Sequence, residues 1–189
     1  MTHIPPSGGE HARQRRVTDM LVSMHSDLRD TYARRATATT SAILVLTALG
    51  ATAAFANGAV PLTILGLSAA RATWAGFLTF GTFALVLVDL VLDHRGAESR
   101  HADAAKRLAE LKARFREPYD PATAASLAQR YEEVTDEVEQ IPGRSFDRLK
   151  SRHLRKVEVS RLLSQHPGLS VHGARRILRT RLAAAKRAV

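Results

Sequence analysis

The 189-residue chain contains no cysteine. Disulfides, thiolate metal ligands and thiol nucleophiles are therefore excluded, and such a composition fits a chain whose bulk lies in a reducing compartment. The first 35 residues are polar and contain no apolar signal sequence, so we expect no cleaved leader. Within them, we expect residues 1–16 to be a disordered N-terminal segment.

Patterns typical of enzymes are also missing. The sequence has no glycine-rich phosphate-binding loop, no histidine and carboxylate spacing typical of a metal site, and no nucleophile followed by a nearby base. His153 falls on an apolar helical line, which favours a packed core residue over a ligand. We therefore expect no enzyme activity, no metal and no cofactor.

Charge is absent from two long stretches, residues 36–70 and residues 72–88. A membrane-spanning helix needs roughly 20 apolar residues, so this region holds two spans and not three. We place the spans at 36–56 and 72–92, which makes 36–92 a transmembrane hairpin. Between them the helical pattern is broken by Asn57, Gly58 and Pro61, and LTILGLSAA is expected to form an interfacial or re-entrant turn.

The distribution of basic residues around the spans predicts their orientation. The connector carries only Arg71, whereas the outer flanks carry Arg29, Arg34, Arg35, Arg95, Arg100, Lys106 and Arg107. Because short cytoplasmic flanks are enriched in Lys and Arg, both termini are expected to be cytoplasmic.

The remaining chain predicts helices only. Residues 17–35 form a cytoplasmic amphipathic helix that continues into the first span as one long helix of about 40 residues. Residues 93–165 form a cytoplasmic helical region, with helix breaks at Pro118, at Ile141-Pro142-Gly143 and at His166-Pro167-Gly168. Residues 166–189 form a basic C-terminal helix. The predicted fold is all-α, a two-helix transmembrane hairpin continuing into a cytoplasmic helical bundle.

Positive charge is concentrated at the C-terminus. Residues 141–189 contain 13 Lys and Arg against 2 Asp and Glu, whereas residues 93–140 contain 8 against 11. Basic clusters beside a membrane anchor are attracted to anionic headgroups, so lipid is the default partner. The alternative is a polyanionic ligand such as a nucleotide second messenger or RNA. The candidate ligand or lipid residues are Arg144, Arg148, Lys150, Arg152, Arg155 and Lys156.

The second span carries a small and polar face that contains a carboxylate. At helical spacing this face comprises Ala75, Thr79, Thr82, Val86, Asp89 and Asp93. One interpretation is that the face packs on the first span, whose Gly50 and Ala54 allow close approach, while Asp89 pairs with Arg34 or Arg35. The other is that several copies turn this face inward, so that Ala75, Thr79, Thr82, Asp89 and Asp93 line a pore with an acidic mouth.

The order of these parts resembles a known family. HSDLRDTYARR, an apolar hairpin, HRGAESRHADAAKRLAELKARF, YEEV and IPGRSFDRLKSRHLRKVEVSRLL are similar to the corresponding parts of the SLATT family of bacterial two-helix membrane effectors, over roughly residues 20–165. The most specific part of the resemblance comprises Ile141, Pro142, Phe146, Leu149, Lys150, His153, Leu154, Lys156, Val157 and Ser160. The basic helix from about Gly168 lies beyond it.

The resemblance implies a bacterial inner-membrane protein that forms homo-oligomeric pores, in a defence or conflict system, and depolarises or kills the cell. A nucleotide second messenger or a sensor protein would be the trigger, membrane lipid would be a partner, and nucleic acid is not the expected partner. Composition alone leaves a second hypothesis open. In that hypothesis the hairpin only tethers a helical interaction module, whose basic C-terminal region binds lipid, nucleic acid or another protein.

Overall fold

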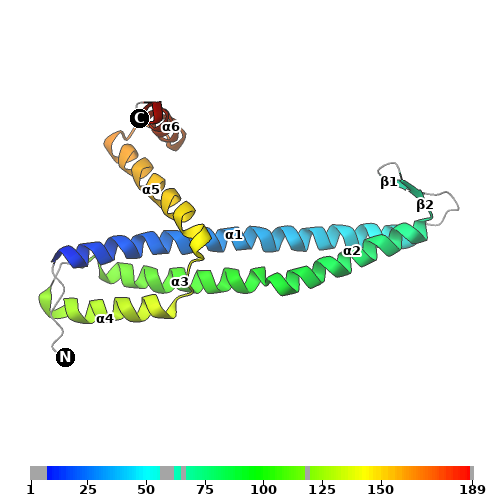
Figure 1. Cartoon of the computed structure of the whole chain (residues 1–189), viewed down its shortest axis with the longest axis horizontal. Coiled ribbons are helices and arrows are strands. Elements are labelled where there is room, and N and C mark those ends of the chain that lie inside the picture. The colour runs from blue at the N-terminus through cyan, green and yellow to red at the C-terminus, as the bar shows by residue number, and fades with distance from the viewer. Residues whose placement is uncertain (1–7, 56–61, 65–66, 118–119, 188–189) are drawn as a thin grey trace. The chain divides into compact units, whose positions relative to one another are not determined.

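A computed structural model describes residues 8–55, 62–64, 67–117 and 120–187, and this part of the chain is helical almost throughout (Figure 1). The helices are α1 (Gly8–Phe55), α2 (Arg71–Leu92), α3 (His94–Arg114), α4 (Pro121–Glu137), α5 (Gly143–Gln165) and α6 (Val171–Arg187). The predicted all-α class is thereby confirmed, with two short strands as its exception. Two helical stretches, in α1 and from Ala72 onward, are long and apolar enough to cross a membrane.

The long first helix is confirmed and begins earlier than expected. Disorder was predicted up to residue 16, but α1 is helical from Gly8. Gln14 and Thr18 are buried within this early part, and the Thr18 hydroxyl donates to the Gln14 carbonyl oxygen at 2.8 Å. His11, in the same early part, packs edge-on against Phe115, with ring centroids 5.1 Å apart. A tertiary contact of this kind orders a polar segment that has no apolar periodicity of its own, which is why the sequence pattern missed it. Residues 1–7 lie outside the described residues.

The connector between the two apolar helices contains short strands that the sequence analysis did not predict. Strands β1 (Leu62–Ile64) and β2 (Leu67–Ala69) pair antiparallel, with Thr63 opposite Ser68. Three residues per strand are too few for an alternating pattern to stand out in a sequence. The three residues expected to break the helix lie outside the described residues; they are Asn57, Gly58 and Pro61.

The chain divides into two compact units, and α1 and α3 contribute to both. The first unit comprises residues 1–27 and 104–189. In it, α1, α3 and α4 share a core whose buried centre is Leu108, Leu111, Phe115 and Val134, with Leu21 and Tyr131 packed against it. Ion pairs reinforce the same contacts, since Lys112 on α3 pairs with Asp19 on α1, and Arg107 lies 2.7 Å from Glu137 on α4.

The second unit comprises residues 28–103, and in it α1 and α2 run antiparallel. A Cβ atom placed on Gly50 would lie 3.5 Å from the Leu78 Cβ, so the helices approach closely at this glycine. Beyond the end of α2, Arg95 Nη2 donates to Thr40 Oγ1 at 3.0 Å. These two contacts fix the register of one helix on the other.

Candidate functional site

The small and polar face of α2 lies at the edge of its contact with α1. Ala75, Thr82 and Asp89 are half-buried, whereas Thr79 and Asp93 are exposed. The Thr82 hydroxyl donates to the Leu78 carbonyl oxygen at 2.8 Å, so its hydrogen bond is made within α2 itself. The candidate pore-lining residues therefore follow the seam between two helices of one chain.

Asp89 does not pair with the arginines proposed for it. The register of α1 on α2 places Asp89 at a level between Thr40 and Gly50, whereas Arg34 and Arg35 lie beyond Thr40. The guanidinium carbon of Arg35 instead lies 5.9 Å from the ring centroid of Tyr32, one turn away on α1. Within the described part of the chain, neither arginine forms an ion pair with Asp89.

Asp93 joins α2 to α3. Its backbone is left-handed, with φ 42° and ψ 51°, and its N–H donates to the Asp89 carbonyl oxygen as the C-cap of α2. Its carboxylate accepts from the Gly96 N–H at 3.0 Å and from Arg100 Nη1 at 3.1 Å, so it also caps the first turn of α3. The hydrogen bond from Arg100, aided by that from Gly96, lowers the pKa of the Asp93 carboxyl below its usual value.

Basic side chains gather between α5 and α6, which pack on each other in the first unit. A groove of about 690 Å³ lies between the two helices. We call it the basic groove, and its charged lining is Arg148, Arg152, Arg155, Lys156, Arg175 and Arg179. Val159, Leu163 and Leu178 add apolar surface to the same lining. Among the described lining residues there is neither a carboxylate nor an aromatic ring.

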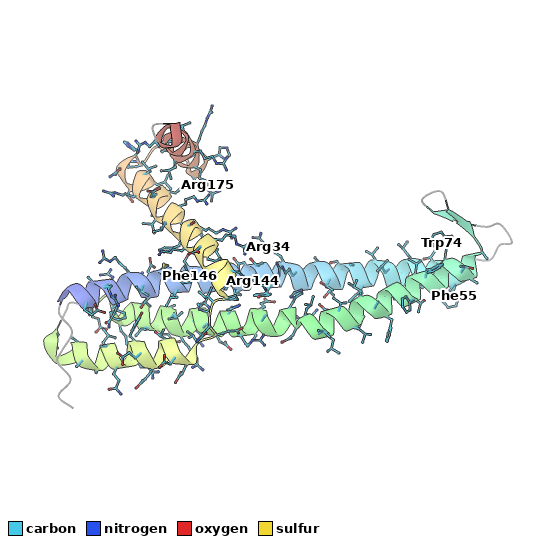
Figure 2. The ribbon with its side chains drawn as sticks, in the orientation of Figure 1. Arg34, Phe55, Trp74, Arg144, Phe146 and Arg175 are labelled. Carbon is cyan, nitrogen blue, oxygen red and sulfur yellow. The ribbon has the colours of Figure 1, made fainter. Side chains whose placement is uncertain are left out.

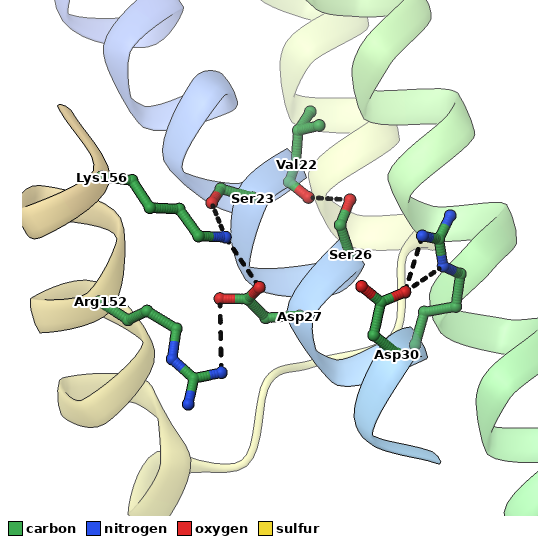
Figure 3. Close-up of polar contacts among 8 residues, drawn as sticks. Val22, Ser23, Ser26, Asp27, Asp30, Arg152 and Lys156 are labelled. Carbon is green, nitrogen blue, oxygen red and sulfur yellow. Dashed lines mark hydrogen bonds and ion pairs between the residues drawn. The ribbon is translucent and has the colours of Figure 1, made fainter. Parts of the chain in front are cut away.

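One carboxylate from α1 reaches two of these cations (Figure 3). Lys156 Nζ lies 2.8 Å from Asp27 Oδ1, and Arg152 Nη1 lies 3.8 Å from Asp27 Oδ2. Lys156 also donates to the Ser23 hydroxyl at 3.5 Å. The Asp27 side chain is only 14% exposed, so its charge is partly shielded from water and is directed at α5.

The basic groove contains four of the six residues that the sequence suggested for ligand or lipid binding. Arg144 and Lys150 are exposed and lie outside it, and Figure 2 labels Arg144 at the start of α5. The sequence analysis missed Arg175 and Arg179 on α6, of which Figure 2 labels Arg175. Their spacing of four residues was the available signal, since it places both on one face of a basic helix.

Several of the described histidines are packed among other side chains. Among the described residues, no group of three or more His, Asp or Glu side chains is placed to hold a metal ion. His153 is buried at 9% exposure, as the apolar line predicted. His101 is buried too, and its ring stacks on that of Tyr32 with centroids 5.5 Å apart. These histidines pack against neighbouring side chains.

Comparison with protein-family models, with curated proteins and with solved structures finds no match to this chain.

Proposed function

We propose that this chain is a bacterial inner-membrane effector, several copies of which assemble into an ion-conducting pore that depolarises or kills the cell in a defence or conflict system. Both termini are cytoplasmic in this proposal. The defence role is supported by the resemblance of residues 20–165 to the SLATT family. A nucleotide messenger or a sensor protein would then trigger opening.

The observation that carries the membrane part of the proposal is the exposed apolar surface of α2. Its large side chains include Phe77, Phe80, Phe83, Leu90 and Val91, which are 60–82% exposed. Leaving such a side chain in water forgoes about 1.5–3 kcal/mol relative to burying it. A continuous apolar surface of this kind is stable when lipid or protein covers it. The length of α2 matches the thickness of the hydrocarbon core of a bilayer.

The small and polar face of α2, which follows its seam with α1, supports the pore part of the proposal. Asp89 lies in an apolar helix and forms no ion pair with Arg34 or Arg35. A carboxylate inside a membrane span is energetically costly unless it meets water or a cation. Two helices of one chain cannot enclose a water-filled path. Assembly of several chains around the seam would give Asp89 water and would align Thr79 and Thr82 along the path.

Ion flux across liposomes that contain the purified full-length chain tests this proposal. We expect flux above that of empty liposomes, and we expect Asp89→Asn to reduce the preference for cations over anions. Asp103→Asn is the matched control, because Asp103 is an exposed carboxylate on α3, outside the predicted spans. Flux with unchanged selectivity in Asp89→Asn would refute the lining role.

A membrane-anchored interaction module is the second candidate, and the basic groove favours it. In that case the apolar helices only hold the groove near its ligand. Liposomes would show no flux, with or without a trigger, while ligand binding by the groove would persist.

A further inference from the structure

We infer that the basic groove between α5 and α6 is a binding site for an acidic phospholipid, with the phosphate held by arginines and the start of an acyl chain lying on the apolar lining. This inference goes beyond the proposed pore, since it concerns a different site in a different unit of the chain. Arg175 and Arg179 belong to α6, which also lies beyond the SLATT resemblance.

Uncompensated charge is the first argument. Asp27 neutralises part of the charge on Lys156 and Arg152. The other four cations of the groove, Arg148, Arg155, Arg175 and Arg179, form no ion pair within the described residues. Like charges that converge on one groove repel one another, and an anion bound among them removes that repulsion.

The chemistry of the charged lining selects the kind of anion. Five of the six basic side chains are arginines, and the planar guanidinium group donates two parallel hydrogen bonds to phosphate oxygens. Arg148 and Arg155 line the groove from α5, and Arg175 and Arg179 line it from α6. A phosphate group between the helices would accept from both sides.

The apolar part of the lining indicates which kind of molecule carries the phosphate. Val159, Leu163 and Leu178 are half-buried and offer an apolar surface next to the arginines. No aromatic ring lines the groove among the described residues, so a nucleobase would have no stacking partner. The volume of about 690 Å³ holds a headgroup with the first carbons of a chain. A phosphate on an apolar body fits this surface better than a nucleotide.

The test measures lipid bound to the detergent-solubilised full-length chain by native mass spectrometry. We expect dioleoyl-phosphatidylglycerol to bind in preference to dioleoyl-phosphatidylcholine. The double variant Arg175→Gln/Arg179→Gln should weaken phosphatidylglycerol binding about 10- to 30-fold. Arg176→Gln/Arg181→Gln is the matched control, because it removes two exposed arginines of the same helix that do not line the groove.

A second pair of variants on α5 guards against misfolding of α6. Arg148→Gln/Arg155→Gln should weaken binding to a similar extent, whereas Arg144→Gln/Lys150→Gln should leave it unchanged. Far-UV circular dichroism checks that all four double variants keep their helix content. Equal losses in groove and control variants would overturn the inference, since binding would then follow net charge alone.

Competition identifies the source of the phosphate. Inorganic phosphate and glycerol 3-phosphate should displace phosphatidylglycerol weakly, because neither contacts the apolar lining. Displacement by either at the concentration of the lipid would refute the phospholipid assignment, as would stronger competition from a single-stranded RNA. Since the readout is bound lipid and not ion flux, failure here leaves the pore proposal unaffected, and the reverse also holds.

Discussion

At the scale of single residues, Asp93 shows how one carboxylate serves two helices. The sequence pattern suggested it as part of an acidic pore mouth. In the structure it is the C-cap residue of α2, and its carboxylate caps the first turn of α3. Because Arg100 and Gly96 stabilise its charged form, its pKa is lowered. Its stabilising contribution is therefore complete above the usual aspartate pKa and is lost as the pH falls through the lowered value.

Gly96→Ala tests this cap. A Cβ on Gly96 would overlap the Asp93 carboxylate, so the carboxylate must leave the Gly96 N–H. We expect thermal unfolding in detergent, followed by circular dichroism, to occur at lower temperature than in the unsubstituted protein. Gly81→Ala is the control, because a Cβ there meets nothing within 4 Å and alanine favours the helix by about 1 kcal/mol. A raised midpoint in Gly96→Ala would contradict the capping role.

At the scale of helices, α5 is attached to α1 by charge. Asp27 receives both Lys156 and Arg152, which lie one turn apart on α5, and the same two cations line the basic groove. A ligand phosphate and the Asp27 carboxylate therefore compete for these side chains. Docking of α5 on α1 and occupation of the groove are linked through them.

Asp27→Asn removes this attachment. We expect amide hydrogen exchange to become several-fold faster along α5, while the change in unfolding free energy stays near 1 kcal/mol, because the two cations are half exposed. Asp30→Asn is the matched control one turn further along α1. Within the part of the chain that the structure describes, the Asp30 carboxylate pairs with Arg29 of the same helix and not with α5 (Figure 3). Unchanged exchange in α5 of the Asp27 variant would show that other contacts hold it.

At the scale of the whole molecule, the question is on which side of the membrane each part lies. Basic residues flank the outer ends of the two apolar stretches, and the connector carries only Arg71. This asymmetry predicts that the connector faces away from the cytoplasm. With the opposite orientation, both termini and the residues of the basic groove would lie on the other side of the membrane from the cytoplasm.

Single introduced cysteines test this topology, since the natural chain has none that would interfere. Intact bacterial cells expressing Ser68→Cys should react with a membrane-impermeant maleimide. Cells expressing Ser126→Cys or Ser164→Cys, on α4 and α5, should react only after permeabilisation. Labelling of all three variants in intact cells would refute the predicted orientation.

The sequence by itself determined the helices, the apolar stretches and the distribution of charge. Periodicity and helix breaks depend on neighbouring residues, so α4 begins after the break expected at Pro118, and α5 ends before the break expected at His166. The sequence did not predict the early start of α1, because tertiary contacts order that segment. It did not predict β1 and β2 either, because strands of three residues are too short to show an alternating pattern.

Only the tertiary structure decided which distant residues meet. Arg175 and Arg179 join the α5 arginines because two helices pack across a short break, and Asp27 reaches Lys156 from a helix more than a hundred residues away in sequence. The register of α1 on α2 likewise places Asp89 away from Arg34 and Arg35. Such meetings depend on how helix surfaces fit together, and local spacing carries no information about that fit.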